Sequence, residues 1–177
     1  MNRTVTLCNI KGRKTGIEDS FEAHVKGLLH LAFSVYLFDP DRTKLLIQKR
    51  SRKKMLWPGI WANTCCSHLF ENETAVEAGE RRLFEELGMR CPLISGTSFV
   101  YRSEDPAGRG TEHEHVTLLS STVSDSVMPK PDPDEVEDWK WIEIPKMLDD
   151  FKKNPDIYAP WLKIGFNKIF EVNNLAI

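Results

Sequence analysis

The chain has 177 residues, 28% of them charged, and a formal net charge of -2 at pH 7, a length that suits one domain with a single buried core. This charge balance gives no general reason to bind nucleic acid or an anionic membrane, so any basic site must be local. No segment is apolar enough for a signal peptide or for the ~20 residues of a membrane span, and the four cysteines do not look like a disulfide framework. We therefore expect a cytoplasmic monomer with one domain over residues 1–177.

The first part of the chain has the pattern of strands and turns. Thr4–Ile10 alternates apolar and polar residues, and a second extended piece begins at Ile17, which together predict a hairpin at a sheet edge. Leu28–Phe38 is apolar, aromatic and β-branched, and Leu45–Gln48 resumes as a strand after a break. These two segments predict a central hairpin.

Two histidines and a basic loop border this predicted hairpin. His24 and His30 flank the entry to its first strand, although a single histidine is more often structural than a metal ligand. The segment Arg50–Lys54 has four basic residues in five, a pattern that usually marks a solvated loop. Here the loop ends at a rigid turn at Trp57, and arginine is suited to bidentate phosphate contact. The sequence is equally consistent with a solvated loop and with a phosphate-binding loop.

The segment Ala62–His68 is predicted to form a short strand. Alternation places Cys66 and His68 on one face and Cys65 on the other. A cysteine in such a position is ordinarily a small buried hydrophobe. Beside His68 and a basic loop, Cys66 is equally a candidate for a reactive thiol.

The rest of the chain is organised around a helix predicted over Ala75–Leu87. Thr74 and Glu77 form a capping box, and Gly88 supplies the C-terminal stop. The helical period puts four apolar residues near one face: Val76, Leu83, Phe84 and Leu87.

A second stripe of this helix combines small and charged residues. Arg82 and Glu86 share it with Ala75 and Gly79. The small residues let another segment approach closely, and a cation lies beside a carboxylate where an acidic ligand and a metal could meet.

Two further strands are predicted at Leu93–Tyr101 and Thr111–Val123, on either side of a loop that contains two glycines. Glu112 and Glu114 share one face of the second strand. Carboxylates two residues apart on a strand can form a hard-metal or acid–base site, although plain exposed charges are more common.

The C-terminal part is predicted to contain one strand and two helices. The acidic run Asp134–Asp138 has the pattern of a solvated loop, and it leads into an edge strand at Trp139–Ile142. A short helix begins at Pro145, and a last helix covers Trp161–Glu171 after a proline at its start. Trp161 itself suits either core packing or an aromatic wall of a site.

The region from Ser67 to Met89 resembles the Nudix box, the loop–helix–loop signature of enzymes that handle diphosphates through magnesium. Written as the family pattern, the chain reads Ser67-x5-Glu73-x7-Arg81-Arg82-Leu83-x-Glu85-Glu86-x-Gly88-Met89. Two positions depart from it, because Ser67 replaces a glycine and Arg82 replaces the first glutamate of the core. Losing a metal-binding carboxylate and gaining a cation favours holding a diphosphate over hydrolysing it. A surface amphipathic helix with charge pairs is the alternative interpretation.

Several other stretches resemble type I isopentenyl-diphosphate isomerase of the same superfamily. They run from about His24 to past Trp161 and comprise LLHLAFSVYLF, the basic loop with WPGIWANTCCSH, RRLFEELG, YRSEDPAGRGTEHEH and APW. The resemblance implies an α+β Nudix-like domain, with a mixed sheet flanked by helices. It also implies conversion of isopentenyl diphosphate to dimethylallyl diphosphate, in isoprenoid biosynthesis, by protonation and deprotonation on opposite faces of the alkene.

The resemblance carries over a full set of site residues. Cys66 and Glu114 match the catalytic pair, and Tyr101 and Trp161 match the groups around the reacting carbons. A site for Mn²⁺, Zn²⁺ or Mg²⁺ is implied at three imidazoles and two carboxylates, His24, His30, His68, Glu112 and Glu114. Glu86 matches the residue that reaches a Mg²⁺ ion bound to the diphosphate. The diphosphate clamp is implied at Arg50, Lys54 and Arg82.

Two other functions are compatible with parts of this pattern. The first is a Nudix hydrolase of a nucleoside or other diphosphate, which Arg82 and Cys66 disfavour. The second is a non-catalytic module that binds metal and phosphate. One phosphate contact of the isomerase family also lacks a counterpart, since Asp19–Glu22 stands where that family offers a lysine.

Overall fold

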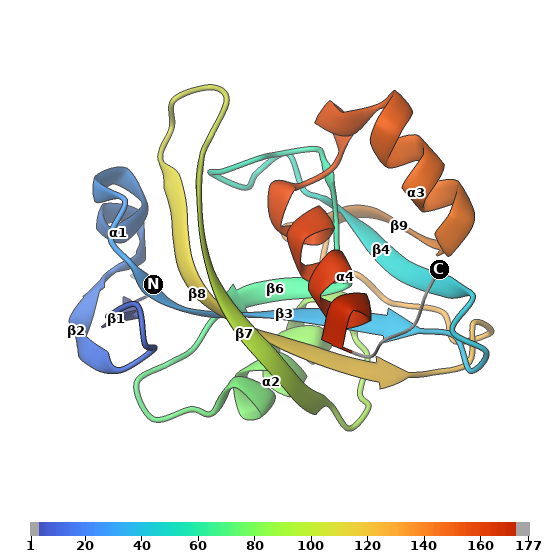
Figure 1. Ribbon diagram of the computed structural model, residues 1–177, viewed down its shortest axis with the longest axis horizontal. Helices are drawn as coiled ribbons and strands as arrows, with labels where there is room; N and C mark the ends of the chain where they lie inside the picture. Colours follow the sequence, from blue (N-terminus) through green and yellow to red (C-terminus); the bar gives the residue numbers. More distant parts are fainter. Residues whose placement is uncertain (1–3, 173–177) are drawn as a thin grey trace.

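The structure is a computed structural model that describes residues 4–172. Within these residues, nine strands form one mixed sheet around β3 (His30–Phe38). β8 (Thr111–Thr122) pairs in parallel with the whole length of β3, and β6 (Cys65–His68) pairs with β3 in antiparallel orientation. The predicted α+β class with a mixed sheet is confirmed (Figure 1).

The N-terminal hairpin and the strand beyond β8 extend this sheet. β1 (Thr4–Cys8) and β2 (Lys14–Asp19) pair as predicted, with β2 at the edge, and β1 joins β3 through Leu7 opposite His30. β7 (Ile94–Glu104) runs antiparallel to β8.

The predicted central hairpin is only partly right. β4 (Lys44–Arg50) does run antiparallel to β3, but two residue pairs join them, because β6 takes up much of the length of β3. β4 pairs instead along its whole length with β9 (Val136–Glu143), and it also pairs with the short β5 (Trp61–Ala62). The basic loop after β4 is thereby brought beside the acidic segment before β9.

Helix α2 (Ala75–Leu87) has the predicted bounds and caps. Thr74 and Glu77 form the capping box, and Gly88 ends the helix in the left-handed conformation with φ 64°. The stripe of α2 that contains Gly79 faces the sheet, since a Cβ atom on Gly79 would overlap the side chain of Leu119 on β8.

The prediction that Phe84 lies on the buried face of α2 is wrong. Its side chain is 45% exposed, and Arg90 stacks over its ring, whereas Leu83 and Leu87 are fully buried. Phe84 comes directly after Leu83, so the helical rotation of about 100° per residue turns it away from the sheet.

A short helix, α1 (Ser20–Lys26), is present where the sequence pattern predicted none. Asp19 caps its first turn by accepting hydrogen bonds from the backbone N–H groups of Phe21 and Glu22, and Gly27 ends it with φ 62°. Both capping residues are present in the sequence, but about two turns of helix give too little periodicity to be recognised.

The remaining helices cover the opposite face of the sheet from α2. α3 (Ile144–Lys153) and α4 (Pro160–Val172) follow β9 and are joined by a short 3₁₀ turn, Pro155–Ile157. Successive side chains of β3 point to opposite faces of the sheet. Tyr36 packs in the hydrophobic cluster with α4, whereas Val35 packs in the cluster with α2.

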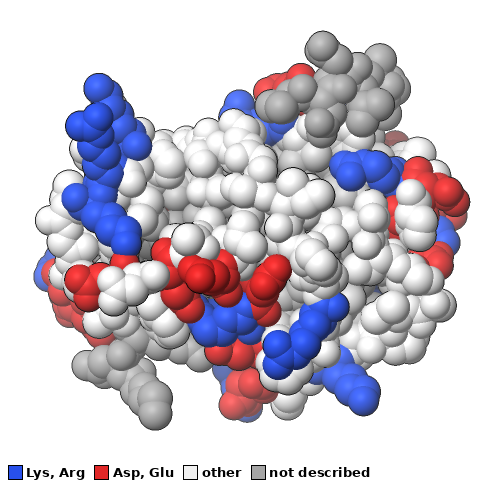
Figure 2. Space-filling view, turned by 90° about the horizontal axis from the view of Figure 1, so that it is seen from below, with Lys and Arg blue, Asp and Glu red and all other residues white. Residues whose placement is uncertain are grey.

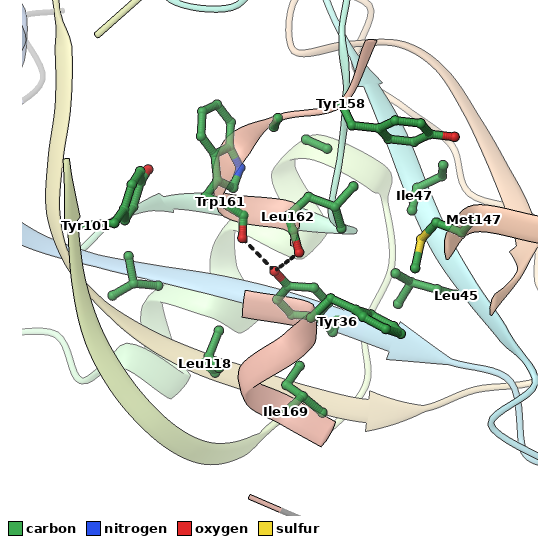
Figure 3. Packing of buried hydrophobic residues seen from close by; sticks show 14 of the residues in the cluster. Tyr36, Leu45, Ile47, Tyr101, Leu118, Met147, Tyr158, Trp161, Leu162 and Ile169 are labelled. Carbon is green, nitrogen blue, oxygen red and sulfur yellow. Dashed lines mark hydrogen bonds between the residues drawn. The ribbon is translucent and has the colours of Figure 1, made fainter. Parts of the chain in front are cut away.

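The start of α4 is fixed to the centre of the sheet by one tyrosine. The hydroxyl of Tyr36 lies 3.1 Å from the carbonyl oxygens of Trp161 and Leu162, to which it donates (Figure 3). Gly165 permits this contact, since a Cβ atom there would overlap the Tyr36 hydroxyl. Trp161 is thereby held at a defined place beside the sheet.

The surface has no dominant charge on the face shown in Figure 2, where acidic and basic side chains form small adjoining groups around uncharged areas. On and near α2, Arg81 forms ion pairs with Glu73 and Glu85. Among residues 4–172, no helix combines the length and apolar character needed to span a membrane.

Candidate active site

The strand registers bring the predicted site residues to one end of the sheet. Glu114 on β8 lies opposite His30 on β3 and opposite Tyr101 on β7. On another strand that pairs with β3, Cys66 lies opposite Ser34 and His68 opposite Ala32. Residues far apart in the sequence are therefore neighbours because of sheet pairing, and α1 adds His24 from the side.

These residues surround a cavity of about 860 Å³. This volume falls in the range of small-molecule sites. Most of the predicted site residues line it: His24, Arg50, Lys54, Cys66, His68, Tyr101, Glu112, Glu114 and Trp161. His30, Arg82 and Glu86 are buried and contribute indirectly, each through contacts with a lining residue or its partner.

Three imidazole rings form a compact triangle at one end of the cavity. The ring centroids of His24, His30 and His68 lie 4.7 to 5.1 Å apart. With Glu112, these histidines offer ligand atoms that all lie within 4.8 Å of one another. The structure thus brings His24 to the cluster, although it comes from a helix and not from the sheet.

The first two histidines are oriented by their Nδ1 atoms. His24 Nδ1 lies 2.5 Å from the carbonyl oxygen of Ser20, and His30 Nδ1 lies 2.8 Å from that of Leu28. These contacts leave the Nε2 atoms available, and among the described residues His30 Nε2 makes no hydrogen bond even though it is buried. Nitrogen ligands oriented by second contacts, with carboxylates beside them, fit a divalent metal ion.

The imidazoles differ in charge because their surroundings differ. Burial disfavours the charged form of His24, but Glu112, whose Oε2 lies 3.2 Å from His24 Nε2, outweighs it and raises the pKa of His24 to about 9. Burial lowers the pKa of His68 to about 4. The cluster therefore holds at least one neutral imidazole at neutral pH, the form that binds metals.

Glu114 connects the histidines to Tyr101. Its Oε2 accepts a hydrogen bond of 2.7 Å from the Tyr101 hydroxyl, and its Oε1 lies 3.1 Å from His68 Nε2 and 3.7 Å from His30 Nε2. Burial alone would raise the pKa of Glu114, but its contacts with the two histidines hold that pKa well below the ordinary value. Glu114 is therefore a carboxylate that faces both the cavity and the histidine cluster.

Cys66 and Cys65 lie on opposite faces of β6, as the alternation predicts. Cys66 lines the cavity, whereas Cys65 is fully buried in the core cluster under α2. Burial raises the pKa of Cys66 to about 12, although the charge of Arg50, whose Nη1 lies 4.0 Å from the sulfur, opposes this shift. Cys66 is therefore a protonated thiol in the free protein.

Trp161 forms an aromatic wall beside these groups and is also part of the core. It is 2% exposed, its ring centroid lies 6.3 Å from that of Tyr101, and the two rings are close neighbours in Figure 3. Trp57 packs edge-on against it at 5.3 Å. Trp161 thus packs in the core and also lines the cavity.

Arg50 is held firmly at the base of the basic loop. Its Nε donates to the carbonyl oxygen of Trp57 and its Nη2 to that of Leu56, at 3.1 and 2.9 Å. The Trp57 backbone N–H in turn donates to Asp105, a buried carboxylate paired with Arg109. The turn after the basic loop therefore fixes the guanidinium of Arg50 beside the cavity.

Comparison with known proteins gives the family. The model of the NUDIX domain family matches residues 28–162. Isopentenyl-diphosphate Delta-isomerase 2 of Aromatoleum aromaticum is 35% identical over 99% of this chain and 90% of its own length. The isopentenyl-diphosphate Delta-isomerase of Rhodobacter capsulatus is 39% identical over 82% of each chain. This chain belongs to the Nudix family and, within it, to the isopentenyl-diphosphate Delta-isomerases.

Solved structures show the same fold at lower identity. A protein of Deinococcus radiodurans aligns with a TM-score of 0.70 and 17% identity, covering 93% of this chain and 98% of its own. A MutT protein of Methanosarcina mazei aligns with a TM-score of 0.63 and 14% identity, covering 83% and 96%. At such identities the likeness concerns the Nudix fold alone.

The Nudix-box residues Arg82 and Glu86 pair with each other in this isomerase-family chain. Arg82 Nη2 lies 2.6 Å from Glu86 Oε1, and Arg82 Nη1 lies 2.7 Å from Glu85 Oε2. The other oxygen of Glu86 accepts a hydrogen bond of 3.1 Å from Gln48. The arginine that departs from the Nudix pattern is therefore surrounded by carboxylates.

The interpretation of the acidic run Asp134–Asp138 as a solvated loop is wrong for Glu135, and residues 136–138 belong to β9. This residue lines the cavity, its side chain is 11% exposed, and it contacts both Lys54 and Arg82. The sequence feature that could have indicated this is that Glu135 comes directly before an apolar residue, Val136. Val136 is buried and pairs with Arg50 in the β4–β9 register.

Proposed function

We propose that the protein converts isopentenyl diphosphate to dimethylallyl diphosphate, the activity that its relatives' names and its own cavity support together. The observation that carries the proposal is that Cys66 and Glu114 line the same cavity. One is a thiol and the other a carboxylate. Moving a double bond by one position requires a proton to be added at one carbon and another to be removed elsewhere.

The surroundings of this pair suit a reaction with a cationic intermediate. Protonation of an unactivated alkene gives a tertiary carbocation, which needs a wall that excludes water and tolerates positive charge. Trp161, beside Tyr101, supplies such a wall. A desolvated indole face stabilises a cation by ~2 kcal/mol, and each 1.36 kcal/mol changes a rate tenfold. Aromatic enclosure therefore accounts for a factor of tens.

The basic side of the cavity suits the diphosphate. Arg50 and Lys54 line it, and Arg82 contacts the lining carboxylate Glu135. We assign these three cations to the substrate's charged end, because binding energy gained there can be used to orient the alkene between Cys66 and Glu114.

We also propose a divalent ion at the histidine cluster and a Mg²⁺ ion accompanying the diphosphate near Glu86. The imidazoles of His24, His30 and His68 with the carboxylates of Glu112 and Glu114 would hold the first, as Mn²⁺, Zn²⁺ or Mg²⁺. When bound, such an ion would supply positive charge that keeps Glu114 ionised or polarises its proton. Glu114 belongs here through its contacts with His30 and His68.

Loss of the metal is expected to destabilise the part of the protein around the histidine cluster. Replacing His30 with alanine should weaken metal binding by more than about 100-fold, since loss even of an outer-shell partner costs 10–100-fold. Metal content after dialysis, measured by inductively coupled plasma mass spectrometry, and the thermal midpoint of unfolding are the readouts. His115→Ala is the matched control, because His115 lies outside the four-residue cluster. Equal metal content in both variants would contradict this site.

The reaction class is tested by incubation with isopentenyl diphosphate and magnesium in deuterated water. Deuterium-labelled dimethylallyl diphosphate, detected by NMR, is the expected product. A Nudix hydrolase acting on the diphosphate bond of the same substrate would release phosphate and leave isopentenyl phosphate instead. Release of phosphate with no shift of the double bond would contradict the proposed isomerase activity.

A further inference from the structure

Glu135 holds together two of the cations assigned to the diphosphate. Its Oε2 lies 2.5 Å from Lys54 Nζ, and its Oε1 lies 3.0 Å from Arg82 Nη2. The pair with Arg82 is shielded from solvent, since the side chains of Glu135 and Arg82 are 11% and 5% exposed, whereas the side chain of Lys54 is 26% exposed. The contacts are charge-assisted on both oxygens, a combination that fixes the positions of both partners.

The same pairs neutralise the cations in the free protein. Arg82 contacts Glu85 and Glu86 in addition to Glu135, so three carboxylates surround this one guanidinium. Glu135 also lowers the positive potential of Lys54. A diphosphate that approaches Lys54 and Arg82 therefore meets the negative charges of Glu135 and Glu86 at close range, which is unfavourable unless another cation balances them.

We propose that Glu135 is a positioning residue that makes diphosphate binding depend on a divalent cation. In the free protein it pairs with Lys54, which lines the cavity, and with Arg82, which is buried and reaches the cavity through Glu135. In the complex its charge lies beside the diphosphate and is tolerated when a cation such as Mg²⁺ accompanies the ligand. The inference rests on the proposed function and adds a residue, and a reason for metal dependence, to the diphosphate end of the site.

The chain contains a matched control two residues further on. Glu137 also pairs with two cations, since Oε1 lies 2.9 Å from Lys49 Nζ and Oε2 lies 3.3 Å from Arg52 Nε. It is 32% exposed, and it is not among the residues that line the cavity. Replacing either glutamate with glutamine removes the same charge from a carboxylate that pairs with a lysine and an arginine. Only the change at Glu135 is expected to alter the binding of a diphosphate.

The test is isothermal titration calorimetry of inorganic diphosphate with the full chain, with and without magnesium chloride. The wild type and Glu137→Gln should show the same strong enhancement of affinity by magnesium. Glu135→Gln should bind metal-free diphosphate about tenfold more tightly or better, because close charge pairs couple by that much, and its magnesium enhancement should shrink by the same factor. Glu135→Asp, which retains the charge, should keep most of the enhancement.

The steady-state kinetics should separate positioning from a general structural role. We expect Glu135→Gln to change the KM for isopentenyl diphosphate and its dependence on magnesium more than kcat, because the residue acts on the charged end of the substrate. If Glu135→Gln does not fold, the double variant Glu135→Gln/Lys54→Gln, compared with Lys54→Gln alone, replaces it, since removing both members of a buried pair leaves no unpaired charge.

The possible outcomes distinguish this inference from the function on which it rests. Equal magnesium enhancement in Glu135→Gln and Glu137→Gln would overturn the role of Glu135 while the diphosphate site stands. A wild type that binds no diphosphate, or binds it as well after Lys54→Ala, would overturn the diphosphate site and this inference with it. A reduced enhancement confined to Glu135→Gln supports the inference.

Discussion

Cys66→Ala is expected to lower kcat for isomerisation by about 10³-fold, within the 10²–10⁴-fold range of general acid–base catalysis. Cys66 lines the cavity and carries a proton at neutral pH, because burial raises its pKa to about 12. The diphosphate ligands that we propose are other residues, so the affinity for inorganic diphosphate should change by less than about threefold. The measurement is a steady-state assay together with calorimetric titration of inorganic diphosphate.

The neighbouring Cys65 provides the control for this variant. It is the same residue type on the same strand, but it is fully buried on the opposite face, in contact with the core under α2. Cys65→Ala should lower the thermal midpoint of unfolding while leaving kcat within a few-fold of the wild type. A Cys66→Ala variant with wild-type turnover, or a Cys65→Ala variant that folds but is inactive, would refute the assignment.

The parts of the structure that the sequence predicted well are governed by local rules. Strand alternation alone separates Cys66 from Cys65, and the observed β6 follows it. The capping box at Thr74 and the left-handed Gly88 fix both ends of α2 to the residue. In each case a few neighbouring residues contain the whole signal.

The parts that the sequence did not predict depend on contacts between distant segments. The ion pair of Lys54 with Glu135 joins residues on either side of β6, α2, β7 and β8, and it forms because β4 pairs with β9. Strand partners are chosen by burial and packing across the whole sheet, which a single sequence does not reveal. For the same reason, Glu135 was predicted to lie in a solvated loop.

The arrangement of the site follows from combining both kinds of rule. Alternation on β8 directs Glu112 and Glu114 to one face, a local feature that the sequence predicted. The parallel pairing with β3 then places Glu114 opposite His30, a contact that no local pattern specifies. The resemblance to isopentenyl-diphosphate isomerase supplied this non-local information, and the registers give its physical basis.

Glu114→Gln is expected to have the largest effect of any substitution in the cavity. This carboxylate accepts a hydrogen bond from Tyr101 and contacts His68 and His30, and we assign it both to the proposed proton-handling pair and to the proposed metal site. Removing its charge should lower kcat by about 10³–10⁴-fold, the upper part of the range for acid–base groups. It should also weaken metal binding, measured as metal content after dialysis.

Two further variants show how much of the activity lost in Glu114→Gln comes from proton handling and how much from metal binding. Tyr101→Phe removes the hydrogen bond to Glu114 but leaves the carboxylate and its histidine contacts, so it should retain the metal and lose less activity than Glu114→Gln. Glu104→Gln, at an exposed position of β7 paired with Arg102, should leave both activity and metal content unchanged. If Glu114→Gln lost the metal but recovered full turnover when excess metal was added, Glu114 would be a metal ligand only. The proton acceptor facing Cys66 would then have to be another of the groups that line the cavity.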